Sequence, residues 1–156
     1  MELELKHVVP YLPYGLDVVR PDGKTKFTIV GVVNDLLLVF ENGSGKYCSI
    51  RGVKPILRPI SSITAKEATD FGNILLGEYE MEDRNVGVGS IQMGDTITPV
   101  IQFIDSDGDS ITVFFGKSEI SCDEGVSFEA YEWLFKQHFD IFYLIEKGLA
   151  IDKNTL

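Results

Sequence analysis

The chain has 156 residues, 44% of them apolar, so it can build a hydrophobic core, and wholesale disorder is excluded. Fourteen Lys and Arg stand against 24 Asp and Glu, and this net charge of −10 argues against a protein whose whole surface binds polyanions. No run approaches the ~18 apolar residues of a membrane span, and the N-terminus lacks the basic and apolar regions of a secretory signal. We therefore expect a cytoplasmic protein without a membrane partner.

Charge is divided unevenly along the chain. Residues 17–66 carry a net charge of +4, whereas residues 67–156 carry −13. Such a division can mark two different partners, can mark pairing of the two parts within one molecule, or can arise by chance in a short chain. We expect residues 1–156 to fold as a single compact unit, with a β-rich basic half at 11–60 and an α+β acidic half at 61–156.

The first half is predicted to consist of short strands joined by tight turns. Apolar and β-branched runs indicate the strands, at 16–20, 27–33, 36–41 and 47–51. Turn signals separate them, at Pro21-Asp22-Gly23-Lys24, Asn34-Asp35 and Asn42-Gly43. This spacing favours a small antiparallel barrel of SH3-like size, or a curved sheet. Two prolines in the segment 54–60 predict an extended connector that is at most an edge strand.

The second half is predicted to contain a helix, a hairpin and a long C-terminal helix. Thr64 and Glu67 have the spacing of a capping box, so a helix is expected over 64–76, although Gly72 is unfavourable inside it. Residues 78–95 are expected to be loop or short strand, and 97–104 with 110–115 a hairpin. The tail carries apolar and aromatic residues at helical spacing, namely Phe128, Tyr131, Leu134, Phe135, His138 and Phe142. The predicted fold class is therefore α+β.

Three motifs resemble functional loops but lack their defining residues. Gly43-Ser44-Gly45-Lys46 has neither the earlier glycine nor the following hydroxyl residue of a phosphate-binding loop, and it lies between strands. Asp105, Asp107 and Asp109 begin like a calcium loop, but the glycine and the closing glutamate of an EF-hand are missing. The glycines at 87–94 do not have the spacing of a dinucleotide fingerprint.

The residues that most often perform catalysis are few. The two histidines are His7 and His138, and His138 lies on the apolar stripe of the tail, where a structural histidine is more common than a general base. Cys48 and Cys122 form neither a disulfide framework nor a metal-ligand pattern, and we expect both to be reduced in a cytosolic compartment. We expect no enzymatic activity, no cofactor and no metal.

Three blocks of the sequence stand out, at 7–16, at 54–60, and at 138–142 together with 144–152. They resemble a family of uncharacterised short proteins encoded by gut Bacteroidetes genomes, their phages and mobile elements. The resemblance implies a bacterial or phage context and carries no catalytic residue. The aromatic residues of the first and last blocks are expected to pack together, in a seam of Tyr11, Tyr14, Phe135, Phe139 and Phe142.

We therefore expect a non-enzymatic interaction module of a phage or mobile element, whose partner is a protein. Its basic segment 17–66 is expected to make a weak contact with nucleic acid, through Arg51, Lys54 and Arg58. The alternative is an acidic decoy or inhibitor of a host nucleic-acid-binding protein, in which residues 67–156 mimic a polyanion. A hydrolytic enzyme is the third alternative.

Overall fold

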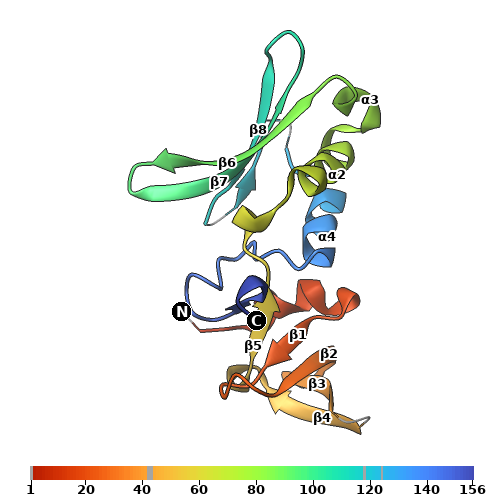
Figure 1. Cartoon of the computed structure of the whole chain (residues 1–156). Helices are drawn as coiled ribbons and strands as arrows, with labels where there is room; N and C mark the ends of the chain where they lie inside the picture. The colour runs from red at the N-terminus through yellow and green to blue at the C-terminus, as the bar shows by residue number, and fades with distance from the viewer. Residues whose placement is uncertain (1, 42–43, 118, 124) are drawn as a thin grey trace. The chain divides into compact units, whose positions relative to one another are not determined.

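The structure, a computed structural model, describes residues 2–41, 44–117, 119–123 and 125–156. The chain divides into two compact units (Figure 1). The terminal unit consists of Met1–Arg58 and Phe135–Leu156, and the inserted unit, Pro59–Leu134, lies between these segments in the sequence. The predicted α+β class is confirmed. Folding as one compact unit over 1–156 stays a prediction.

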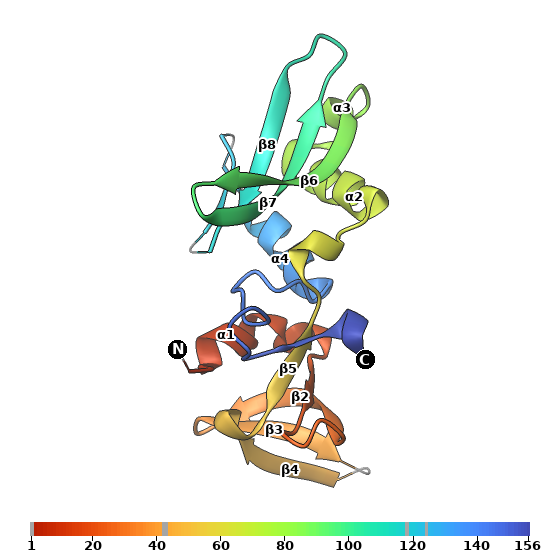
Figure 2. The same cartoon turned by 60° about the vertical axis from the view of Figure 1, so that its left-hand side comes forward.

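The terminal unit contains a six-stranded mixed sheet in the order β10-β5-β1-β2-β3-β4 (Figure 2). Its strands are β1 (Asp17–Val19), β2 (Lys26–Val33), β3 (Leu36–Glu41), β4 (Ser44–Ser49), β5 (Lys54–Leu57) and β10 (Ile151–Asp152). All neighbours are antiparallel except β10, which pairs parallel to β5. The barrel prediction is wrong, because in the described part of the chain β4 and β10 end the sheet and do not close it. The Asn42-Gly43 turn predicted between β3 and β4 lies outside the described residues.

Short helical segments complete the terminal unit. They are α1 (Leu5–Val8), η1 (Val9–Tyr14), η2 (Ile50–Gly52) and η4 (Lys153–Thr155). One hydrophobic core joins the sheet to both ends of the chain, because Tyr11, Leu37, Leu57 and Leu144 are all fully buried in it. Burial of these apolar side chains away from water contributes most to the stability of the terminal unit.

The segment 54–60 is not the edge strand that its prolines predict. β5 lies between β1 and β10 in the strand order, with Pro55 opposite Val18 of β1. The proline is tolerated because the two neighbours use different halves of β5: β1 pairs with Lys54 and Pro55, and β10 pairs with Ile56 and Leu57. Pro55 therefore does not have to donate a hydrogen bond to β10.

The inserted unit packs helices against a four-stranded antiparallel sheet in the order β6-β7-β8-β9. Its elements are η3 (Ile60–Ser62), α2 (Ala65–Leu76), α3 (Glu78–Met81), β6 (Asn85–Met93), β7 (Thr96–Ile104), β8 (Ser110–Phe115), β9 (Ile120–Ser121) and α4 (Phe128–Lys136), whose last turn belongs to the terminal unit. The predicted helix over 64–76 and its capping box are confirmed, as is the β7–β8 hairpin. Residues 85–93, predicted as loop or short strand, form a nine-residue strand.

The long C-terminal helix predicted for the tail is absent from the described residues. α4 ends at Lys136, and His138 and Tyr143 then take positive φ angles of 59° and 56°, which a right-handed helix cannot contain. Phe139 instead forms a parallel β-bridge with Arg58. Phe142, which continues the aromatic spacing past α4, packs against Tyr11 from the turns that follow the helix.

Gly72 allows α2 to approach the sheet. A Cβ added at this buried position would lie 2.5 Å from Cε1 of Phe103 on β7 and 2.8 Å from the end of Met81. The residue that weakens the helix prediction is thus the residue that brings α2 against β7. None of the helices in the described residues has the length and apolar character needed to cross a bilayer.

Candidate functional site

The predicted aromatic seam is confirmed for the rings of Tyr11, Phe135 and Phe142, which lie inside the terminal unit. The Tyr11 hydroxyl donates a 2.7 Å hydrogen bond to the Phe139 carbonyl. Its ring packs edge-on against Phe135 and Phe142, with centroid distances of 5.0 and 6.4 Å. Tyr14 takes part through its carbonyl, which lies 3.2 Å from Nε2 of His138. These contacts tie the start of the chain to its end, which is a structural role.

Both histidines are held within the fold. His7 is buried, and its Nδ1 accepts a hydrogen bond from the Glu4 backbone N–H at 3.0 Å. Burial lowers the pKa of His7 and of His138, because it disfavours the charged imidazolium. The nearby Asp140 carboxylate accepts hydrogen bonds from the backbone N–H groups of Leu144 and Ile145, while burial raises its pKa. The geometry around both rings is that of structural histidines.

The loop motifs have structural roles in the described residues. Oδ1 of Asp105 accepts hydrogen bonds from the backbone N–H groups of Asp107 and Asp109, at 3.1 and 2.9 Å, which shapes the β7–β8 tip. Among the described residues, no group of three or more His, Cys, Asp or Glu is arranged to hold a metal ion. Ser44, Gly45 and Lys46 lie in strand β4, while Gly43 lies outside the described residues. Neither Cys48 nor Cys122 forms a disulfide.

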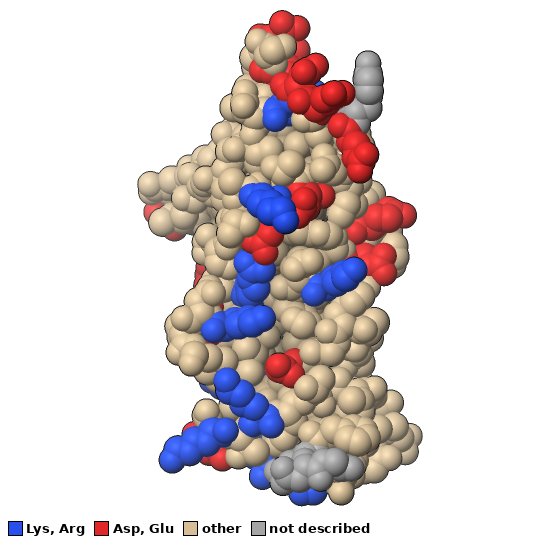
Figure 3. All heavy atoms as spheres, turned by 45° about the vertical axis from the view of Figure 1, so that its right-hand side comes forward, with Lys and Arg blue, Asp and Glu red and all other residues tan. Residues whose placement is uncertain are grey.

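Charge is divided between the two units. The terminal unit carries eleven Lys and Arg against nine Asp and Glu, whereas the inserted unit carries three against fifteen, a formal charge of −12. On the face drawn in Figure 3, Asp and Glu predominate over the inserted unit, and Lys and Arg over the terminal unit. The uneven charge found along the sequence therefore corresponds to a difference in charge between the two folded units.

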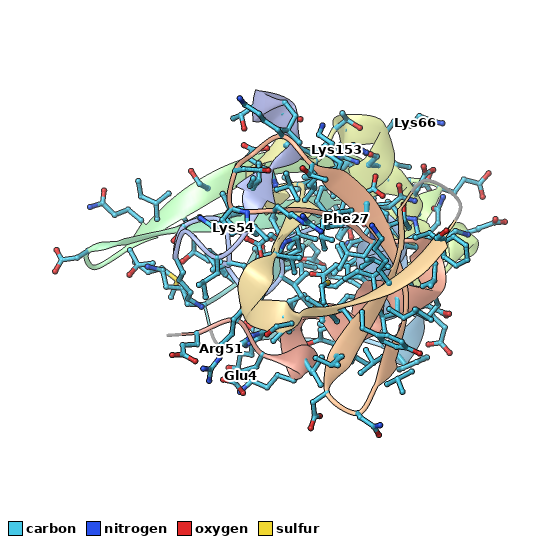
Figure 4. All side chains as sticks on the ribbon, turned by 90° about the horizontal axis from the view of Figure 1, so that it is seen from below. Glu4, Phe27, Arg51, Lys54, Lys66 and Lys153 are labelled. Atoms are coloured by element: carbon cyan, nitrogen blue, oxygen red, sulfur yellow. The ribbon has the colours of Figure 1, made fainter. Side chains whose placement is uncertain are left out.

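The three predicted nucleic-acid-binding residues have different environments. Arg51 of η2 and Lys54 of β5 are labelled in Figure 4, and both line a hollow of about 290 Å³ together with the apolar residues Leu3 and Val53. Arg51 is paired with Glu2 at 3.2 Å. Arg58 does not line this hollow, and its guanidinium lies 4.5 Å from the centre of the Phe139 ring. A weak nucleic-acid contact through these three residues stays a prediction.

The most distinctive surface of the terminal unit was missed in the sequence. Leu36 to Phe40 are five consecutive apolar residues, which is typical of a strand that is covered on both faces. Of these five residues, however, only Leu37 and Val39 are buried in the core. Leu36 and Phe40 point to the opposite face and are 40% and 52% exposed. The unbroken apolar run is the sequence signal that could have revealed this surface.

Neighbouring strands extend this surface, because residues paired across a ladder share a face. Val33 of β2 lies opposite Leu36, and Tyr47 of β4 lies opposite Leu38. Val33 and Tyr47 are 43% and 59% exposed. We call this surface the outer face, and it consists of Val33, Leu36, Leu38, Phe40 and Tyr47. Its centre has no charged side chain, while Asp17 and Lys26 lie near its edge, in the ladder that joins β1 to β2.

Comparison of the chain with protein-family models, with curated proteins and with solved structures finds no match. The candidate site therefore depends on geometry alone. An uncharged apolar centre containing Phe and Tyr, with polar residues at its edge, has the composition of a protein–protein interface.

Proposed function

We propose that the chain is a non-enzymatic interaction module whose outer face binds an apolar surface of another protein. The single observation that supports this function is the exposure of Val33, Leu36, Phe40 and Tyr47 on one face of β2–β4. Nucleic acid does not suit this surface, because phosphates require cations and the outer face has none at its centre. The sequence resemblance adds a context, which is a bacterial host carrying a phage or mobile element.

The test compares a variant of the outer face with a matched variant of the inserted unit. Leu36→Ser with Phe40→Ser removes two apolar side chains from the outer face. The control, Ile74→Ser with Phe128→Ser, removes two that are 37% and 77% exposed on the helices of the inserted unit. Circular dichroism and thermal unfolding first establish that both variants fold.

Each protein is then immobilised and exposed to an extract of a gut Bacteroidetes host. A partner captured by the wild type and by the control, but not by the outer-face variant, is purified and its dissociation constant is measured by calorimetry. We expect binding that the outer-face variant weakens at least tenfold, which is the usual effect of truncating an aromatic at the centre of an interface. Equal binding of both variants would contradict the proposal. Self-association that only the outer-face variant abolishes would also contradict it, because the partner would then be a second copy.

The division of charge supports a second candidate, the acidic decoy or inhibitor of a host nucleic-acid-binding protein. Fifteen carboxylates and three cations in one folded unit can compete with a polyanion for a basic surface. In this case the captured partner would be released by duplex DNA and by salt. A partner of the outer face would be released by neither, because apolar contacts are insensitive to both.

A further inference from the structure

The longest exposed strand edge of the inserted unit belongs to β6. This strand pairs with β7 over nine consecutive residue pairs, from Asn85↔Ile104 to Met93↔Thr96, without a register shift. β6 ends the strand order of its sheet, so among the described residues it has one neighbour. Every residue of β6 except Val86 is exposed. The edge thus presents alternate backbone N–H and C=O groups to solvent over most of its length.

Devices that normally protect such an edge are missing from β6. Native edges are usually short, or are interrupted by charged side chains, prolines or bulges. Residues 85–94 contain neither a charge nor a proline, although the unit around them carries eighteen charged residues. The edge strand β4 of the other sheet, in contrast, has six residues and contains Lys46. An unprotected edge of this length is suited to strand addition by an extended peptide.

One end of β6 is strongly acidic. Arg84 holds the segments there together: its side chain donates hydrogen bonds to the carbonyls of Glu80 and Phe103, and its Nη2 lies 3.8 Å from Oδ2 of Asp105. The start of β6, the end of α3 and the β7–β8 tip therefore lie side by side. Seven carboxylates belong to these segments, and we call them the acidic end: Glu78, Glu80, Glu82, Asp83, Asp105, Asp107 and Asp109.

The negative charge of the inserted unit indicates which kind of partner can bind along β6. A second copy of the chain would bring two units of charge −12 together along their edges, which like-charge repulsion opposes. We propose that β6 binds an extended segment of a basic partner protein, which adds a fifth strand to the sheet and places Lys or Arg beside the acidic end. Antiparallel pairing is the more stable arrangement per residue. The basic residues of the segment then follow its uncharged β-forming residues in sequence, since its C-terminal end lies beside Asn85.

This site is separate from the outer face, which belongs to the terminal unit, so each proposal can fail without the other. The probe is a fluorescein-labelled peptide of alternating Thr and Val, long enough to span β6, with Lys residues at its C-terminal end. Three controls accompany it: the same peptide with Lys at the N-terminal end, with Lys replaced by Gln, and with alternate backbone nitrogens methylated. Methylation removes the donors that strand addition needs.

Binding is measured with the full chain by fluorescence anisotropy, and amide hydrogen exchange is followed by NMR. We expect the probe to slow exchange at alternate residues of β6 while leaving β4 unchanged. The methylated peptide is expected not to bind, and the other two controls to bind at least about threefold more weakly. The double variant Glu82→Gln with Asp83→Asn should weaken binding of the probe by a similar factor. The control variant Glu129→Gln with Glu132→Gln, on α4, should leave binding unchanged.

Three results would overturn the proposal. The first is binding without added protection in β6. The second is equal binding of the methylated peptide. The third is protection of the same amides by a rise in protein concentration alone, because the edge would then be occupied by a second copy.

Discussion

The hydroxyl of Tyr11 donates a hydrogen bond of 2.7 Å to the carbonyl oxygen of Phe139, a residue 128 positions further along the chain. Both side chains are fully buried. Burial raises the pKa of the Tyr11 phenol above its ordinary value, so the group stays protonated and remains a donor at neutral pH. The bond fixes η1 against the turns that follow α4.

Removing that hydroxyl should destabilise the protein. Tyr11→Phe keeps the ring contacts with Phe135 and Phe142 but deletes the buried hydrogen bond, so we expect the free energy of unfolding to fall by about 1 kcal/mol. Urea unfolding of Tyr11→Phe is compared with that of Tyr47→Phe, whose hydroxyl belongs to an exposed side chain. Equal midpoints for the two variants would show that the bond makes no net contribution.

Adding a methyl group at Gly72 should lower the free energy of unfolding. Gly72→Ala raises helix propensity by up to about 1 kcal/mol, but the new Cβ meets the fully buried Phe103 ring, and overpacking of this kind costs about 1–3 kcal/mol. We therefore expect a net loss of stability in thermal unfolding. Gly89→Ala is the control, because a Cβ there meets nothing within 4 Å. A Gly72→Ala protein more stable than the wild type would mean that α2 shifts away from β7 at little cost.

The sequence predicted α2 and most strands correctly, since their capping, alternation and turn residues act locally. Longer-range effects decided the rest. Gly87 and Gly89 suggested a loop, yet β6 forms because β7 offers nine consecutive partners. The tail kept helical spacing past Lys136, but the positive φ of His138 and the bridge from Phe139 to Arg58 end the helix, and no local signal announces either.

The same substitution should destabilise the protein far more at one of two adjacent leucines on β3 than at the other. Leu37 is fully buried, so Leu37→Ala should lower the free energy of unfolding by about 2–5 kcal/mol, because a cavity replaces its side chain. Leu36→Ala removes an equal side chain from the outer face and should cost less than about 1 kcal/mol. Denaturant unfolding of both variants checks the alternation. A large loss at Leu36 would mean that the outer face is covered within the chain, and the proposed interface would then lose its basis.

The sequence alone could not show which of these two leucines is buried. Alternation is the signal that separates the two faces of a strand, and residues 36–40 are all apolar, so the pattern fits either orientation. The structure resolves the orientation through cross-strand pairing, in which Leu37 faces the same side as Val32 and Cys48. The predicted basic residues were equally ambiguous, because an ion pair with Glu2 and stacking on Phe139 are not visible in the sequence.

Stability should depend on pH through the two histidines. Their pKa values are lowered from 6.5 in the folded protein, so between the folded and unfolded values the unfolded state binds more protons. The stabilisation is present above pH 6.5 and is lost as the pH falls towards the folded pKa values. We expect the free energy of unfolding to fall more between pH 7 and pH 5 in the wild type than in a variant with both histidines replaced by Asn.

Asp140 changes the free energy of unfolding with pH in the opposite direction to the histidines. Its pKa is raised in the folded protein, so its contribution to stability is lost as the pH rises through the folded pKa. Because Asp140 is present in both proteins, the comparison between them isolates the histidines. Parallel pH profiles would contradict the prediction.

The sequence of the inserted unit interrupts that of the terminal unit, and this determines which unit can be completed first during translation. The inserted unit is continuous in sequence over 59–134, so all of it is synthesised before the last strand of the terminal unit. The terminal unit needs Ile151 beside Ile56 and Phe139 beside Tyr11, pairings that a growing chain cannot form until these C-terminal residues have been synthesised. Until then the apolar side chains of β1–β3 lack the C-terminal segment that completes their core. A chain truncated before Phe135 would contain every residue of the inserted unit, but it would lack the segment that completes the core of the terminal unit.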